Sequence, residues 1–187
     1  MKTLVAGVSL MAVAAFAAAH RPLHAAEPAG VRAVIMSASL RRPAPAFRLA
    51  DASNRAVPLS RYRGRVVLLD FWATECGGCK VEIPWFMEFK RVYQSRRFEV
   101  VGVSMDIPYE SLKDAADGWR LVKPFVQSHH VNYSILMADD NVTKAYAVTA
   151  LPVTYLIDRS GRIAAEYPGL VDKDDVERNI RILLAER

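Results

Sequence analysis

The chain of 187 residues is long enough for one compact domain with a short additional segment, and 52% of its residues are hydrophobic. Its 25 lysines and arginines exceed its 20 acidic residues, which gives a net charge of +5, and the basic residues are scattered in short clusters. Because no dense basic stripe with interleaved aromatic residues occurs, the composition argues against a nucleic-acid-binding protein.

The N-terminal segment has the pattern of a secretory signal. Lys2 supplies a positive start, an almost entirely apolar run extends to Ala19, and small residues suited to cleavage follow. We predict a signal peptide over residues 1–26, with export to the periplasm or another extracytoplasmic compartment. The alternative is an uncleaved membrane anchor, although the apolar run is shorter than the ~20 residues that a spanning helix needs. Residues 27–42 show no clear period and are predicted to form a linker.

The remaining residues, 43–187, are predicted to form one α/β domain. Hydrophobic patterns in its first half predict short strands at 47–49 and 56–57 joined by a turn, a buried strand at 66–72 and a helix from 77 to about 97. In the second half they predict a strand at 98–105, a helix at 111–129 divided or kinked by Pro124, a strand at 134–137, a short helix at 141–146, strands at 153–157 and 162–167, and a closing helix at 172–186. Strands that alternate with helices before a final hairpin and helix predict a mixed central sheet flanked by helices.

The chain has two cysteines, Cys76 and Cys79, separated by two glycines. A structural disulfide usually closes a longer loop, because a very short loop restricts the unfolded chain little. A zinc site would need four ligands, and there is no second cysteine pair. The predicted strand and helix place Cys76 at a helix N-terminus, where free N–H groups and the helix dipole favour a thiolate. The pattern therefore favours redox chemistry, with Cys76 as nucleophile and Cys79 as the resolving thiol.

The residues around this pair resemble a known active-site signature. Asp70-Phe-Trp-Ala-Thr-Glu-Cys-Gly-Gly-Cys-Lys-Val-Glu-Ile-Pro84 is similar to the thioredoxin superfamily and, more narrowly, to the bacterial TlpA/ResA-like thiol–disulfide oxidoreductases. Further similarity at residues 63–69, 100–106 and 151–158 extends the resemblance over about residues 43–187. It implies a thioredoxin-like fold with an N-terminal β-hairpin and a helical insertion, a redox-active Cys76–Cys79 disulfide, and no cofactor or metal.

The resemblance also implies a substrate-binding surface next to the cysteines. Pro152 corresponds to a cis-proline that faces the redox pair, a geometry that is rare elsewhere. The main chain of Leu151 would then be open to a strand-like segment of a substrate. Trp72 would lie at the edge of this surface, although core packing is the simpler role for an aromatic side chain on a buried strand. An ordinary trans proline at 152 is the alternative.

Two acidic residues are candidates for proton transfer. Asp70 lies on the predicted buried strand, where a charged residue is rarely found without a specific role. Glu82 follows Cys79 by almost one helical turn, where TlpA/ResA-like proteins carry a glutamate. Either carboxylate, kept partly protonated by burial, could take the proton from Cys79. The alternative for Glu82 is a solvated position on the helix surface.

Two residues depart from the family pattern. Glu75 stands where relatives usually have an aromatic residue, and its negative charge should raise the pKa of Cys76. Gly78 replaces a common proline and leaves the loop between the cysteines more flexible. Both departures weaken the inference that this chain shares one particular partner with better-matched relatives.

The resemblance predicts a dithiol reductase of protein disulfides, with apocytochrome c as one candidate substrate and a membrane thiol donor for its own reduction. A thiol peroxidase of the peroxiredoxin type is a second hypothesis. Its Pro-x-x-x-Thr-x-x-Cys pattern is absent, because Leu69 and Ala73 occupy the required positions before Cys76. A copper-delivery protein is a third hypothesis, which the two-residue spacer disfavours.

Overall fold

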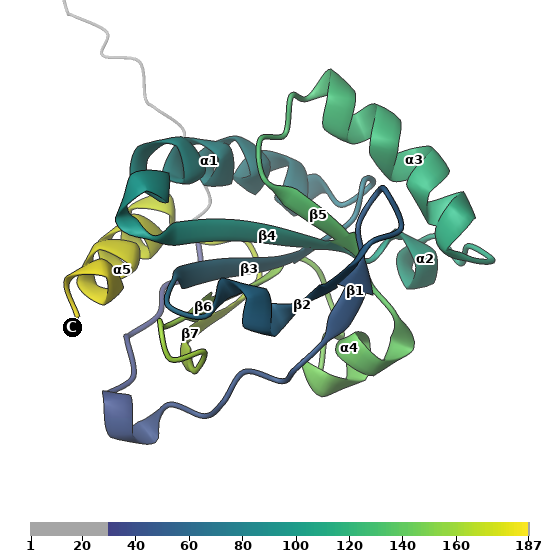
Figure 1. Cartoon of the computed structure of the whole chain (residues 1–187). Coiled ribbons are helices and arrows are strands. Elements are labelled where there is room, and N and C mark those ends of the chain that lie inside the picture. The colour runs from purple at the N-terminus through teal and green to yellow at the C-terminus, as the bar shows by residue number, and fades with distance from the viewer. Residues whose placement is uncertain (1–29, 187) are drawn as a thin grey trace, which may run out of the picture.

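The structure, a computed structural model, describes residues 30–186 (Figure 1). Its centre is a five-stranded sheet in the order β5-β4-β3-β6-β7. The strands are β3 (Val66–Trp72), β4 (Phe98–Ser104), β5 (Ser134–Met137), β6 (Val153–Ile157) and β7 (Ile163–Pro168). β3, β4 and β5 are parallel, whereas β6 is antiparallel to both β3 and β7. The prediction of a mixed central sheet is therefore confirmed.

The remaining elements surround this sheet (Figure 1). They are the hairpin β1 (Arg48–Ala50) and β2 (Ala56–Pro58), the helices α1 (Gly77–Tyr93), α2 (Asp106–Tyr109), α3 (Ala115–Ser128), α4 (Asp140–Ala145) and α5 (Lys173–Ala185), and 3-10 helices at Ala38–Leu40, Leu59–Tyr62 and Gln94–Arg96. The small hairpin and the helices α2 and α3, inserted between β4 and β5, complete the predicted thioredoxin-like arrangement.

Strand β3 organises two apolar layers. All seven of its residues are buried, and their side chains alternate between the faces of the sheet. Val66, Leu68 and Trp72 join the layer that contains residues of α1, α3 and α5. Val67 and Leu69 join the layer beneath α4 and the hairpin. This alternation directs Asp70 to the same face as α1.

Two helices differ from their predicted bounds. The helix expected from 111 begins at Ala115, where the Asp114 side chain accepts hydrogen bonds from the N–H groups of Ala116 and Asp117. It then runs through Pro124 as one helix, so the predicted division there is wrong, while the alternative of a kink stays a prediction. The separate turn of α2 before it was not predicted. Helix α1 likewise ends earlier than predicted, at Tyr93, and passes into a 3-10 turn.

The segment expected to be a linker packs along the domain from residue 31 onward. Val31 bridges to Val171, and Arg41 is only 3% exposed. The Arg41 guanidinium forms ion pairs with Asp158 at 3.1 Å and with Glu186 at 2.6 Å. These contacts tie residues 31–42 to both the β6–β7 turn and the C-terminal end of the domain.

Replacing Arg41 should lower stability, because it leaves a buried charge unpaired. Arg41→Ala leaves the mostly buried Asp158 carboxylate without its cation, and we expect unfolding free energy to fall by about 3 kcal/mol. Arg42→Ala is the matched control, because the Arg42 side chain is 55% exposed and its ion pair with Glu166 contributes at most about 1 kcal/mol. Urea unfolding of both variants measures the difference, and equal losses would contradict the anchoring role.

Gly102 on β4 lets three side chains approach the strand. A Cβ atom there would lie 2.7 Å from Ile135 Cδ1, 2.9 Å from Trp72 Nε1 and 3.2 Å from Tyr133 Cε2. We therefore expect Gly102→Ala to lower unfolding free energy by about 1–3 kcal/mol through overpacking. Gly77→Ala is the control, since a Cβ at Gly77 meets no atom within 4 Å. A thermal midpoint for Gly102→Ala equal to that of the control would refute the packing argument.

Within residues 30–186, no helix is both long and apolar enough to cross a membrane. The signal peptide predicted over residues 1–26 lies outside the described residues and stays a prediction.

Candidate active site

The two cysteines are joined in a disulfide at the start of α1. The Cys76 and Cys79 sulfurs are bonded, with the Cα atoms 5.3 Å apart, which confirms the predicted pairing. Cys76 is the N-cap residue of the helix, and its Sγ accepts a hydrogen bond from the Cys79 N–H at 3.2 Å. Cys76 retains 4% exposure, whereas Cys79 has none. Cys76 is therefore the sulfur that an incoming disulfide or thiolate can reach first.

The local electrostatics at Cys76 favour a thiolate. The first turn of α1 carries no acidic residue, so its free N–H groups and helix dipole act on the sulfur without local opposition from the helix. Glu75, predicted to raise the pKa of Cys76, is exposed and forms an ion pair with Lys80 at 3.2 Å. This pairing offsets part of the negative charge next to the cysteine.

Pro152 lies against the loop between the cysteines. The Leu151–Pro152 peptide bond is cis, as the resemblance implied. A Cβ atom at Gly78 would lie 3.2 Å from Pro152 Cδ, which places the proline ring next to the first turn of α1. Pro152 is buried and Leu151 is half-buried. A role for these two residues in binding substrate remains a prediction.

Trp72 does not lie at the edge of a substrate surface as predicted. Its side chain is fully buried and packs against Phe125, with ring centroids 5.2 Å apart. The reason is that Trp72 faces the α1 and α3 side of the sheet, where the chain covers it completely. Its contribution is to the core beneath the site.

Both predicted acidic residues are buried, Asp70 on β3 and Glu82 on α1 three residues after Cys79. Asp70 and Glu82 each have 0% exposure, so Glu82 is not a solvated helix residue. Glu82 Oε1 accepts a hydrogen bond from the Val171 N–H at 2.7 Å, whereas Oε2 and both Asp70 oxygens have no hydrogen-bond partner among residues 30–186. Burial raises the pKa of the Asp70 carboxyl well above its ordinary value. The pKa of Glu82 is raised by burial and further by the nearby Asp70.

These two carboxyls belong to a wider buried polar cluster on one face of the sheet. Thr154 is the register partner of Asp70 on β6, and its hydroxyl opposes the rise in the pKa of Asp70 without reaching hydrogen-bond geometry. Burial raises the pKa of Tyr133, and the two carboxyls raise it further. Within the part of the chain that the structure describes, the Tyr133 hydroxyl and the Trp72 indole N–H also have no hydrogen-bond partner. Buried polar atoms of this kind are usually satisfied by ordered water.

Sequence reasoning identified Asp70 and Glu82 but missed Tyr133 and Thr154. Thr154 could have been found only from the exact register between β3 and β6, which the sequence does not specify. Tyr133 precedes β5 and reaches the cluster over Gly102, a contact between distant parts of the chain.

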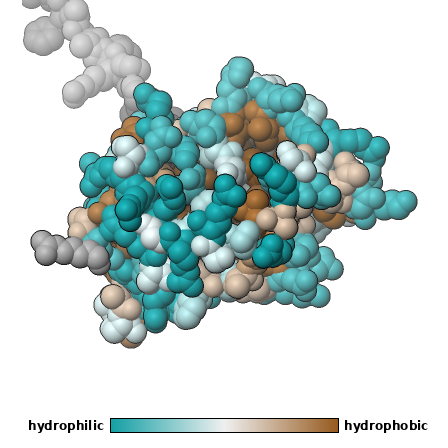
Figure 2. All heavy atoms as spheres, viewed as in Figure 1, coloured by the Kyte–Doolittle hydropathy of each residue, from teal (hydrophilic) through white to brown (hydrophobic). Residues whose placement is uncertain are grey.

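A separate cleft lies between the β1–β2 turn and α3. It has a volume of about 670 Å³, and Trp119, Lys123 and Tyr133 are among its lining residues. Figure 2 shows apolar side chains exposed beside β5 and α3 in this region. Tyr133 therefore lies between this cleft and the buried carboxyls, while the cysteines lie outside the cleft lining.

The fold and the disulfide at the start of α1 define a thioredoxin-like protein. A family model described as AhpC/TSA matches residues 40–166, so the chain belongs to that family. The thiol–disulfide oxidoreductase ResA of Geobacillus thermodenitrificans is 32% identical over 137 residues, covering 73% of this chain and 74% of that protein. Within the family, the chain thus belongs with the thiol–disulfide oxidoreductases of the ResA type.

Other relatives agree with this placement. ResA of Bacillus subtilis is 28% identical over 141 residues, covering 75% of this chain and 73% of that protein. A putative thiol:disulfide interchange protein DsbE from Chlorobium tepidum superposes with a TM-score of 0.67 at 28% identity, covering 78% of this chain and 97% of that one. The predicted resemblance to TlpA/ResA-like proteins is therefore confirmed.

Proposed function

We propose that this protein is an extracytoplasmic reductase of protein disulfides. The observation that carries the proposal is a disulfide at a helix N-terminus together with two buried carboxyls of raised pKa, Asp70 on the strand before it and Glu82 on the helix itself. An accessible sulfur, a buried resolving sulfur and a buried base are the parts that thiol–disulfide exchange requires. The names of the relatives support the same chemistry.

In the reduced protein, the Cys76 thiolate attacks one sulfur of the substrate disulfide. A mixed disulfide forms with Cys76, and the other substrate sulfur leaves as a thiolate that takes a proton from water. An ionised carboxylate of Asp70 or Glu82 then takes the proton of the Cys79 thiol. The Cys79 thiolate attacks Cys76 Sγ, forms the internal disulfide and releases the second substrate sulfur. Two electrons pass from the protein to the substrate.

A raised pKa suits this proton transfer. A carboxylate of ordinary pKa is a weak base toward a thiol, whose usual pKa is about 8.5. Burial of Asp70 and Glu82 brings their basicity closer to that of the thiol, so the transfer between them costs less free energy. The mutual repulsion of two carboxylates strengthens the effect, because it opposes ionisation of both at once.

The predicted export signal supports an extracytoplasmic site of action. There, the protein would reduce substrates such as the haem-binding cysteines of apocytochrome c and would itself be reduced by a membrane thiol donor. The half-buried Leu151, next to Pro152 and Gly78, offers a main-chain edge on which an extended substrate segment would bind.

Insulin reduction with a thiol donor tests the proposed activity. We expect the purified protein to accelerate precipitation of the insulin B chain well above the donor alone. Absence of acceleration, with the cysteines shown to be reduced, would refute the reductase.

A peroxidase is the second candidate, because the matching family model is described as AhpC/TSA. The buried Ala73 takes the place of the threonine in the peroxidase pattern and offers no hydroxyl to a peroxide. We expect peroxide consumption no faster than that of an ordinary dithiol. Copper titration of the same sample tests the third hypothesis.

A further inference from the structure

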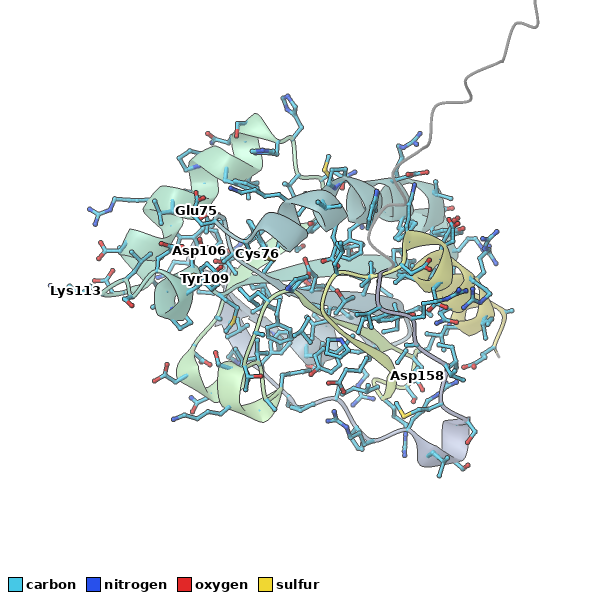
Figure 3. All side chains as sticks on the ribbon, turned by 180° about the vertical axis from the view of Figure 1, so that it is seen from behind. Glu75, Cys76, Asp106, Tyr109, Lys113 and Asp158 are labelled. Atoms are coloured by element: carbon cyan, nitrogen blue, oxygen red, sulfur yellow. A yellow bond between two sulfur atoms is a disulfide. The ribbon has the colours of Figure 1, made fainter. Side chains whose placement is uncertain are left out.

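The turn that leads from β3 to Cys76 is attached to a buried carboxylate at the start of α2, just after the neighbouring strand β4. Asp106 follows β4 and has 0% exposure. Its Oδ1 accepts hydrogen bonds from the Thr74 N–H at 2.9 Å and from the Thr74 hydroxyl, and its Oδ2 accepts from the Ser104 hydroxyl at 2.8 Å. Figure 3 shows Asp106 and Cys76 at the same end of the molecule.

These bonds continue the parallel ladder between β3 and β4 beyond its last residue pair, Trp72 and Ser104. The Met105 N–H donates to the Trp72 carbonyl at 2.7 Å, after which the chain turns into α2 and offers no further strand carbonyl. The Asp106 carboxylate takes that place and binds the Thr74 N–H. The Asp106 side chain thus accepts the hydrogen bond from the turn that a carbonyl of a longer strand would accept.

The held turn ends at the redox cysteine. The Cys76 N–H donates to the Ala73 carbonyl at 3.2 Å, so residues 73–76 form one closed turn with Thr74 inside it. Cys76 then caps α1 with its sulfur toward the Cys79 N–H. Movement of Thr74 would change the direction of the Cys76 side chain and its alignment with the first turn of the helix.

We propose that Asp106 is a positioning residue for Cys76. Through Thr74 it fixes the turn that aligns the Cys76 sulfur with the N–H groups at the start of α1. The inference rests on the proposed thiol–disulfide exchange, because it concerns the stability of the Cys76 thiolate in the reduced protein. Within residues 30–186, the Asp106 carboxylate accepts its hydrogen bonds from neutral donors, the Thr74 N–H and the hydroxyls of Thr74 and Ser104.

Asp106→Ala tests the role, since it removes the acceptor for Thr74. With the turn released, the Cys76 thiolate loses alignment with the N–H groups, and the reduced form becomes less favourable. We expect the equilibrium with glutathione to shift about tenfold toward the disulfide, which is about 30 mV for a two-electron couple. We also expect alkylation of reduced Cys76 at pH 7 to slow about tenfold.

Two further variants separate positioning from general damage. Asp106→Asn keeps an oxygen for the Thr74 N–H and should stay within threefold of the wild type in both measurements. Thr74→Val removes the hydroxyl donor but keeps the backbone donor, and it should fall between the wild type and Asp106→Ala. If Asp106→Ala does not fold, Thr74→Val still tests the proposal.

Asp175→Ala is the matched control. Asp175 is 2% exposed and accepts hydrogen bonds from the Ala33 N–H and the Tyr167 hydroxyl. Its loss should lower unfolding free energy without changing the glutathione equilibrium. If Asp106→Ala and Thr74→Val both matched the control in leaving that equilibrium unchanged, Asp106 would be structural only. If the wild type itself failed to exchange with glutathione, the proposed function would fail instead.

Discussion

Cys76→Ser should abolish insulin reduction, with a loss of at least about 10³-fold. The variant removes the one sulfur of the pair that has exposure in the folded protein, and a serine hydroxyl cannot form the mixed disulfide. Cys79→Ser should behave differently, because its Cys76 can still attack a substrate. We expect that variant to accumulate a stable mixed disulfide, visible by non-reducing electrophoresis and mass spectrometry.

The two variants control for each other, since both lack the internal disulfide and differ only in which sulfur remains. Trapping by Cys76→Ser instead of Cys79→Ser would reverse the assigned roles. Equal trapping by both would show that the burial of Cys79 does not decide which sulfur reacts first.

Replacing the buried carboxyls should raise the free energy of unfolding and slow the reaction with substrate. At neutral pH, folding places Asp70 and Glu82 where their charged forms are unfavourable, as their raised pKa values indicate. The folded protein then binds more protons than the unfolded chain, so stability falls as pH rises above the ordinary carboxyl pKa of about 4. We expect Asp70→Asn to raise unfolding free energy at pH 7 by about 2 kcal/mol and to flatten this pH dependence.

The same substitutions remove the base for Cys79. We expect Asp70→Asn and Glu82→Gln each to slow release of substrate from the mixed disulfide about tenfold, and the double variant to slow it at least about 10²-fold. Stopped-flow measurement of single turnovers isolates this step from the attack by Cys76. Asp175→Asn, at a buried carboxylate whose pKa is lowered, is the control and should not be stabilised.

If the double variant were more stable but released substrate from the mixed disulfide at the wild-type rate, the carboxyls would not take part in proton transfer. Loss of stability in Asp70→Asn would contradict the sign of the pKa shift itself.

Sequence patterns were sufficient for the order of the elements and for the redox pair. Strand β3, apolar except for Asp70, and the two glycines at the start of α1 have strong local signals, and the cysteine spacing is unambiguous. The roles predicted for Asp70 and Glu82 came from the family resemblance at those positions and from the charge of Asp70 on a buried strand. The structure adds that both side chains are buried and that three of their four carboxyl oxygens have no hydrogen-bond partner within residues 30–186, which supports those roles.

Other features depend on contacts between distant segments. Arg41 stands in a stretch without any period, and its burial depends on residues more than a hundred positions away. The bond from Thr74 to Asp106 arises from the register of β3 and β4, and the position of Thr154 opposite Asp70 arises from the register of β3 and β6. Of the two roles predicted for Trp72, core packing is confirmed and a place at the edge of the substrate surface is wrong, because the strand is covered on the face that carries Trp72.

Whether the Cys76–Cys79 bond opens and closes reversibly is best measured by redox titration. The purified protein would be equilibrated in glutathione buffers from strongly reducing to strongly oxidising, and its thiols would be blocked and counted by mass spectrometry. We predict a single two-electron transition in which both cysteines become protected together. An unchanged count of blocked thiols across the whole range would contradict a redox role for the pair.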